Sequence, residues 1–375
     1  NTGLFWNSDI TGGAGGTTTA SPTAADDLNI VQATTTNTGT ITMTGTKAAS
    51  SISFASGVGA VTISGGTSIT IGGTGTSSGI FNNSASNQSV STPLILNSTV
   101  SAFNFSNSDA GLLTIGGTVT GTATIGNIQT ITIGSSSSGG ITRTGSIGNG
   151  SAGGKVAVTV NNTSGGVTNF SSGNAYTGGL LIQSGTASAG NFTSAFGGTG
   201  NVITLGDATN ANATLATTGN TAGGSIGNNI IVAASAGTLS ILVGGTNNSS
   251  AMNGTITLNS NVTLANSAPI GRTATFSNVI SGNFGITAGI STANLSTSVV
   301  SLTGANTYNG TTTISFGTLQ LGDGTTGKDG TIANSLSIVN NAALRYNRFG
   351  ETSYSGVISG TGTVTKTGVG TQILT

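Results

Sequence analysis

The sequence predicts an all-β fold in which short strands stack into a solenoid, and three observations predict it. Apolar residues alternate with Ser or Thr in short runs along the whole chain, turn residues separate the runs, and several segments recur. Bulky core residues are scarce, because aromatic residues make up 5% of the 375 residues. The interior is therefore expected to be thin, as in a coil of stacked repeats.

The alternating runs are the expected strands. Apolar residues two positions apart lie on one face of a strand, and the Thr and Ser residues between them lie on the other face. The clearest runs are residues 41–43, 52–54, 61–63, 69–71, 131–133, 156–160, 256–258, 262–264, 319–321 and 336–338. Residues suited to turns, such as Gly65-Gly66 and Asn340-Asn341, lie between them. No long segment has a helical period, so no significant helix is expected.

The composition excludes several classes of function. Charged residues make up 4% of the chain, with 8 Lys and Arg against 8 Asp and Glu, whereas ordinary domains contain about a quarter charged residues. Nucleic acid and anionic lipid are therefore unexpected partners. The chain has no His and no Cys, so a zinc site of the usual type and a histidine base are excluded. We expect no cofactor and no enzymatic activity.

Repeated segments support a coil with insertions in its loops. Residues 170–186 match residues 302–318 at an Asn, a Tyr, two Gly and an Ile in the same spacing. Residues 276–282 match residues 354–360, and Leu-Gly-Asp occurs at 205–207 and at 321–323. With coils of roughly 20–25 residues, such repeats would stack as rungs.

Residues 302–322 resemble the autotransporter-associated β-strand repeat, which is also called the passenger-associated transport repeat. The copy at 170–186 is looser. The N-terminal part resembles the start of such passengers, in Trp6 and in residues 26–30, 48–54 and 61–66. The resemblance implies a right-handed parallel β-helix that bacteria export through the outer membrane to the cell surface or release. It implies no catalytic residues.

We expect a single continuous solenoid over residues 1–375, with a cap and the first coils in 1–70 and repeat-like segments at 147–205 and 277–375. Nothing in the chain resembles a signal peptide, a translocator barrel or an apolar run of about 18 residues. The sequence stops within a repeat. Either the chain continues, or another molecule supplies the completing strand.

An open solenoid end can accept a strand from another molecule, and a contact that does not close produces a filament. The predicted self-assembly residues are Leu4, Phe5 and Trp6 at one end and Gln372, Ile373 and Leu374 at the other. The alternative for Phe5 and Trp6 is an aromatic cap over the first coil.

Few residues could hold a cation or act as acids. Asp323 and Asp329 are weak candidates for a metal site, with a tight acidic turn as the alternative. Asp26 and Asp27 are expected in a turn or cap. Arg345, Arg348 and Glu351 are expected to form a surface ion-pair group, which would contribute little to stability.

The leading hypothesis is an extracellular structural protein, a β-solenoid subunit or segment of a bacterial surface filament that assembles head to tail with copies of itself. The alternative is a monomeric passenger that acts as an adhesin on surface glycans or other cells, with residues 72–92 and 135–154 as contact loops. A carbohydrate-active β-helix enzyme is a distant third. No insertion of this segment into a membrane is expected.

Overall fold

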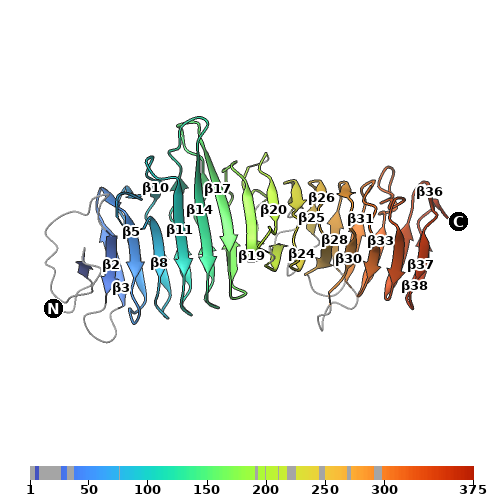
Figure 1. Cartoon of the computed structure of the whole chain (residues 1–375), viewed down its shortest axis with the longest axis horizontal. Helices are drawn as coiled ribbons and strands as arrows, with labels where there is room; N and C mark the ends of the chain where they lie inside the picture. Colours follow the sequence, from blue (N-terminus) through green and yellow to red (C-terminus); the bar gives the residue numbers. More distant parts are fainter. Residues whose placement is uncertain are drawn as a thin grey trace. The chain divides into compact units, whose positions relative to one another are not determined.

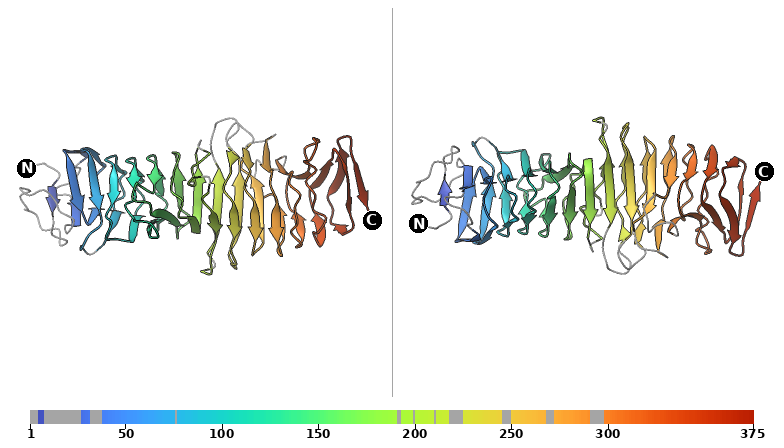
Figure 2. Two further views of the ribbon diagram at one scale, coloured as in Figure 1. Left: turned by 90° about the horizontal axis from the view of Figure 1, so that it is seen from above. Right: turned by 90° about the horizontal axis from the view of Figure 1, so that it is seen from below.

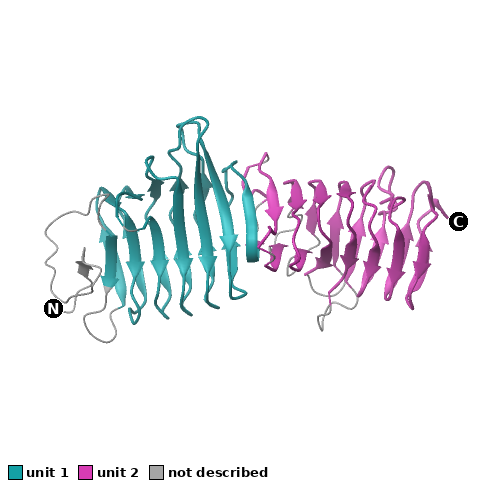
Figure 3. Cartoon of the chain, in the orientation of Figure 1, with its two compact units in different colours: residues 1–187 teal, residues 188–375 magenta. Residues whose placement is uncertain are grey.

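The computed structural model describes residues 5–7, 27–31, 38–75, 77–190, 193–198, 200–209, 211–217, 225–244, 250–267, 272–290 and 298–375. These ranges contain strands and turns and no helix, and so no helix suited to crossing a bilayer, and the predicted parallel β-solenoid is confirmed. The chain forms two compact units, residues 1–187 and 188–375 (Figure 3). That they form a single continuous, right-handed solenoid stays a prediction.

Unit 1 is a stack of coils with three faces, and each face is a ladder of parallel strands (Figures 1 and 2). Face 1 consists of β2 (Asp27–Val31), β5 (Ser51–Phe54), β8 (Gly79–Asn82), β11 (Ala102–Asn107), β14 (Ile128–Ser135), β17 (Lys155–Asn161) and the start of β19 (Leu180–Ala189). Face 2 consists of β3 (Gly39–Met43), β6 (Val61–Gly65), β9 (Gln88–Val90), β12 (Leu113–Ile115), β15 (Ile141–Arg143) and β18 (Val167–Phe170). Face 3 consists of β4 (Thr46–Ala49), β7 (Ser68–Ile71), β10 (Leu94–Leu96), β13 (Val119–Thr120) and β16 (Ile147–Gly148).

Unit 2 has the same three-faced arrangement of parallel ladders. Face 1 consists of β20 (Ile203–Leu205), β23 (Ile230–Val232), β26 (Ile256–Leu258) and β29 (Ile280–Gly282). Face 2 consists of β21 (Ala213–Thr217), β24 (Leu239–Val243), β27 (Val262–Asn266), β30 (Ile286–Ala288), β32 (Thr312–Ile314), β34 (Ser337–Asn340) and β37 (Val357–Ser359). Face 3 consists of β22 (Ser225–Ile226), β25 (Ser250–Met252), β28 (Thr273–Phe276), β31 (Val299–Leu302), β33 (Thr318–Leu321), β35 (Ala343–Asn347) and β38 (Thr363–Thr367). The pair β36 (Glu351–Tyr354) and β39 (Thr371–Leu374) follows.

The core is made of apolar columns that run from coil to coil. On face 1 of unit 1, the register stacks inward side chains that are all buried, namely Leu28, Ile52, Ile80, Phe105, Ile133 and Val160. Each residue covers the one before it, so a few apolar side chains per rung are enough to exclude water. This is the thin interior that the composition predicts.

The coils vary in length more than expected. Partner residues in adjacent strands lie between 19 positions apart, at Leu302 and Leu321, and 28 positions apart, at Ser51 and Gly79. The range is wider than the expected 20–25 residues because the turns absorb extra residues while the strands keep their register.

The predicted strands fall within observed strands, with one error at a boundary. Strand β34 begins at Ser337, and Leu336 lies in the turn before it with 73% of its surface exposed. The alternation placed Leu336 inward together with Ile338, but an alternating pattern holds only inside the strand.

Candidate functional site

The matching segments 170–186 and 302–318 fasten one coil to the previous one. The Asn174 side-chain oxygen accepts a hydrogen bond from the backbone N of Ile147 at 2.7 Å, and Asn306 does the same for Ile280 at 3.0 Å. Both asparagines are buried. The most specific sequence match therefore has a structural role, because the spacing that the two segments share serves coil-to-coil hydrogen bonds.

The glycines of these segments permit the coils to approach closely. A Cβ atom on Gly178 would lie 2.5 Å from the carbonyl oxygen of Val156, and one on Gly310 would lie 2.2 Å from the backbone N of Gly285. Real Cβ atoms do not approach backbone so closely. A side chain at either position would push adjacent coils apart.

Two of the predicted N-terminal assembly residues, Phe5 and Trp6, lie on a strand that pairs antiparallel, whereas the strands of the ladders pair parallel. Strand β1 (Phe5–Asn7) pairs antiparallel with β2, with Phe5 opposite Val31 and Trp6 opposite Ile30. This pairing occupies the backbone edge of β2 that faces away from β5. Leu4 lies outside the described residues, and a role of Phe5 and Trp6 in self-assembly stays a prediction.

The predicted C-terminal assembly residues share strand β39, which pairs with β36. The register places Leu374 opposite buried Tyr354, yet Leu374 is 52% exposed, and Val364 opposite buried Leu344 is 48% exposed. These two side chains occupy core positions that no further coil covers in the described chain. Ile373 is partly exposed as well.

Gln372, the third predicted residue of that strand, ties β39 to the preceding coil. Its side-chain oxygen accepts hydrogen bonds from Arg348 Nε at 3.0 Å and from Thr352 Oγ1 at 2.8 Å. The amide is thus occupied within the chain, whereas Leu374 is available for contact.

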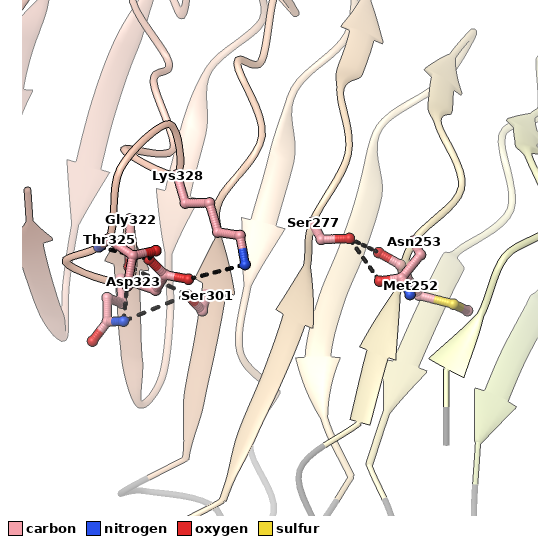
Figure 4. A network of polar contacts seen from close by, with 9 residues as sticks. Met252, Asn253, Ser277, Ser301, Gly322, Asp323, Thr325 and Lys328 are labelled. Atoms are coloured by element: carbon pink, nitrogen blue, oxygen red, sulfur yellow. Dashed lines mark hydrogen bonds and ion pairs between the residues drawn. The ribbon is translucent and has the colours of Figure 1, made fainter. Parts of the chain in front are cut away.

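The two candidate metal-binding aspartates have separate structural roles, Asp323 within its own turn and Asp329 in a link to the next coil. Asp323 accepts a hydrogen bond from the Thr325 backbone N at 2.9 Å and lies 3.7 Å from Lys328 Nζ (Figure 4). Asp329 accepts hydrogen bonds from the backbone N of Phe349 at 2.6 Å and of Gly350 at 3.2 Å. The described residues contain no cluster of three metal-ligating side chains.

Asp207 and Asp27 also accept hydrogen bonds within the protein. Asp207 accepts a hydrogen bond from the Thr209 backbone N at 2.9 Å, as Asp323 does from Thr325, so the Leu-Gly-Asp repeat marks a turn. Asp27 Oδ1 accepts a hydrogen bond from Ser51 Oγ at 2.7 Å in the next coil, and Asp26 lies outside the described residues.

The prediction of a surface ion-pair group is wrong for Arg348. This side chain is 2% exposed, and its guanidinium lies 5.1 Å from the ring centroid of Tyr346. Burial lowers the pKa of Arg348 to about 10. Arg345 donates a hydrogen bond to Gln320 at 3.2 Å, and within the described chain neither arginine pairs with the exposed Glu351.

Sequence reasoning missed a second buried arginine. Arg143 occupies the core column between Ile115 and Phe170 and is fully buried. Its guanidinium donates to the carbonyl oxygens of Ile115 at 2.9 Å and Gly145 at 3.0 Å, and burial lowers its pKa to about 9. The signal was present, since alternation with Ile141 places Arg143 inward.

The predicted contact loops are mostly turns that contain two short strands each, and contact through them stays a prediction. Residues 72–92 contain β8 and β9, and residues 135–154 contain β15 and β16. The turns before β14 and β17 form a protrusion, and the second of these turns belongs to the predicted loop 135–154 (Figure 1). An antiparallel bridge joins Thr124 and Gly153 there, and Ile125 is 84% exposed.

The outer side of face 2 carries one hydroxyl per coil over five successive strands in each unit, up to Asn169 in β18 and Val339 in β34. We call these sets the hydroxyl columns. In unit 1 the column consists of Thr40, Thr62, Ser89, Thr114 and Thr142. In unit 2 it consists of Thr214, Ser240, Thr263, Thr287 and Thr313. Neither column contains an ionisable side chain.

Comparison with known proteins gives one match to part of the chain. The "Adhesin BmaC autotransporter" of Brucella suis biovar 1 (strain 1330) is 54% identical over 59 residues, which is 16% of this chain and 2% of that protein. The chain is similar in part to an autotransporter adhesin. No protein-family model matches the chain, and no solved structure matches it.

Proposed function

We propose that the chain is a segment of a bacterial β-solenoid exported to the cell surface or released, where it takes part in attachment to glycans or cells. The local similarity to a protein named as an autotransporter adhesin carries this proposal, and it agrees with the resemblance of residues 302–322 to passenger repeats. We therefore prefer the adhesin hypothesis to the hypothesis of a filament subunit.

The solenoid supports attachment because it holds polar side chains on rigid, evenly stepped faces. Each contact from a Thr or Ser hydroxyl is weak, since it replaces a hydrogen bond to water. Many such contacts along one scaffold combine into stable attachment when the partner is itself repetitive. The low charge leaves short-range contacts rather than long-range steering as the basis of binding.

The test is attachment of beads coated with the purified chain to a panel of bacterial and animal cells. Beads coated with the chain should bind at least one cell type above beads coated with the heat-unfolded chain. Equal binding of both preparations to every cell type would contradict the proposal.

End-to-end assembly is a second candidate, favoured by the exposed core-register residues Val364 and Leu374. Sedimentation over a range of concentrations and electron microscopy test it. Assembly should lengthen rods with concentration and should be abolished by Leu374→Lys, with the already exposed Val369→Lys as control. A monomer at every concentration would exclude assembly of this chain.

A further inference from the structure

The hydroxyl column of unit 1 is a regular array on a flat surface. Its members are register partners in successive parallel strands, so adjacent hydroxyls are separated by about 4.8 Å along the stack. From Thr62 to Thr142, the residues on either side of each member in the strand, such as Ile63 beside Thr62 and Ile115 beside Thr114, are buried in the core. The array is therefore fixed by the backbone ladder beneath it.

Most hydroxyl groups of this column form no hydrogen bond to another side chain among the described residues. In the described chain, Ser89 is the one member with a side-chain hydrogen bond, at 3.4 Å to Ser91 Oγ. The outer column of face 3 in unit 2 differs, because Arg345 donates to Gln320 at 3.2 Å and Gln320 donates to the Gly322 carbonyl oxygen at 2.8 Å. Face 2 of unit 1 thus offers hydroxyl groups free to donate and accept, whereas Gln320 and Arg345 on face 3 of unit 2 are paired within the protein.

A second row of small polar residues lies beside the column. It follows the ends of the face 2 strands and consists of Thr42, Ser64, Ser91, Gly116 and Thr144. A Cβ on Gly116 would lie 3.3 Å from Ser91 Oγ and 3.3 Å from Thr144 Oγ1. A methyl group at this position would crowd both hydroxyls, so the glycine keeps the row low between the exposed side chains of Ser91 and Thr144.

We propose that face 2 of unit 1 binds an extended, uncharged polysaccharide that lies along the hydroxyl column. Hydroxyl groups both donate and accept, as sugar hydroxyls require, and threonine methyl groups offer apolar contact to sugar C–H groups. The rung spacing is close to the length of one sugar residue in an extended chain. A polyanion would require cationic partners, and neither row contains an ionisable residue.

This inference names a ligand class for the proposed attachment function and rests on that proposal. Its test is calorimetric titration of the whole chain with cello-oligosaccharides of two to six residues, with oligogalacturonate as the anionic control. Affinity should rise with each added sugar and level off near the length of the column, while oligogalacturonate should not bind.

The double variant Thr62→Val/Thr114→Val removes two central hydroxyls and keeps the β-branched shape. We expect it to weaken binding of the longest oligosaccharide by about tenfold. The matched control is Thr275→Val, which makes the same change on the outer side of face 3 in unit 2. Thermal melts of all three proteins verify that each is folded.

An affinity that does not change with the length of the oligosaccharide, or that is the same in the double variant, would overturn the proposal. Slowed ice recrystallisation without sugar binding would assign the column to water ordering and would also overturn it. If coated beads attach to cells while no oligosaccharide binds, only this inference fails. If the beads do not attach either, the proposed function fails with it.

Discussion

Two tyrosines show how equivalent positions in a repeat can differ in hydrogen bonding. Tyr176 and Tyr308 occupy the same place in the matching segments, and both are fully buried. The Tyr308 hydroxyl lies 2.7 Å from Thr312 Oγ1, whereas the Tyr176 hydroxyl has no hydrogen-bond partner in the described chain. A buried polar group without a partner costs free energy that an apolar replacement recovers.

The two tyrosines therefore predict opposite effects of one substitution. Tyr308→Phe should lower the free energy of unfolding by about 1 kcal/mol, because it removes a buried hydrogen bond and leaves Thr312 with Ser335 as its side-chain partner. Tyr176→Phe should leave stability unchanged or raise it slightly. Urea denaturation of both variants checks the prediction, and equal losses would contradict it.

Buried tyrosines also predict the response to alkaline pH. Burial raises the pKa of Tyr346 to about 12, and it also raises the pKa values of Tyr176 and Tyr308 above their usual range. An unfolded tyrosine loses its proton near pH 10. Between these values the folded state holds more protons than the unfolded state, so stability falls as pH rises.

Because the unfolded chain ionises Tyr346 at a lower pH than the folded chain does, this residue alone should lower the free energy of unfolding by about 1 kcal/mol between pH 8 and pH 11. Urea melts at pH 8 and pH 11 measure the loss, and Tyr346→Phe should reduce it. The Tyr346 hydroxyl has no hydrogen-bond partner in the described chain, so this variant should remain stable at pH 8. An unchanged pH dependence in the variant would count against the explanation.

At the scale of the element, coil stacking is governed by positions where no side chain fits. Gly310→Ala places a Cβ 2.2 Å from the Gly285 backbone N, whereas a Cβ on Gly148 would have no atom within 4 Å and an ordinary backbone angle. Gly310→Ala should cost about 3 kcal/mol or prevent folding. Gly148→Ala should cost under about 1 kcal/mol, and similar losses at both sites in thermal melts would refute the distinction.

The strands were predictable because alternation is a local property of the sequence. The spacing of Ile131, Ile133 and Val158 is enough to indicate that they are buried. Leu336 was placed wrongly because the strand begins one residue later, and the burial of Arg143 and Arg348 was not predicted because their partners include residues of adjacent coils. Arg143 is held by carbonyl groups of its own turn and the previous coil, and alternation alone does not reveal such partners.

The candidate surface was harder to predict than the fold. The hydroxyl columns required the register between strands more than twenty residues apart, which variable turn lengths hide. The repeat at 170–186 and 302–318 is the more specific signal in the sequence, yet its Asn and Gly residues serve packing. The free surface residues Thr62 and Thr114 look like any other threonines in the sequence.

At the scale of the whole molecule, each coil depends mainly on its neighbours, as in other repeat proteins. Strands β37, β38 and β39 pair on one side and have mostly exposed side chains in the described chain, whereas β14 pairs with both β11 and β17. Backbone amides of β38 should therefore exchange with deuterium at least about tenfold faster than those of β14.

Hydrogen exchange read by mass spectrometry measures both strands in one sample. Faster exchange in β38 would place the least stable part of the molecule at residues 355–375. Equal protection of the two strands would mean that this edge is covered in solution, and sedimentation of the same sample would reveal whether a second copy covers it.

The uneven coil length has a consequence for how such a surface can change. Lengthening a flexible turn costs free energy that grows only with the logarithm of its length. The ladders hold their register while partner residues range from 19 to 28 positions apart. Peptides inserted at the corners would therefore alter what the molecule presents to its surroundings while the stacked core stays unchanged, which makes the corners the natural places to graft new epitopes or binding loops.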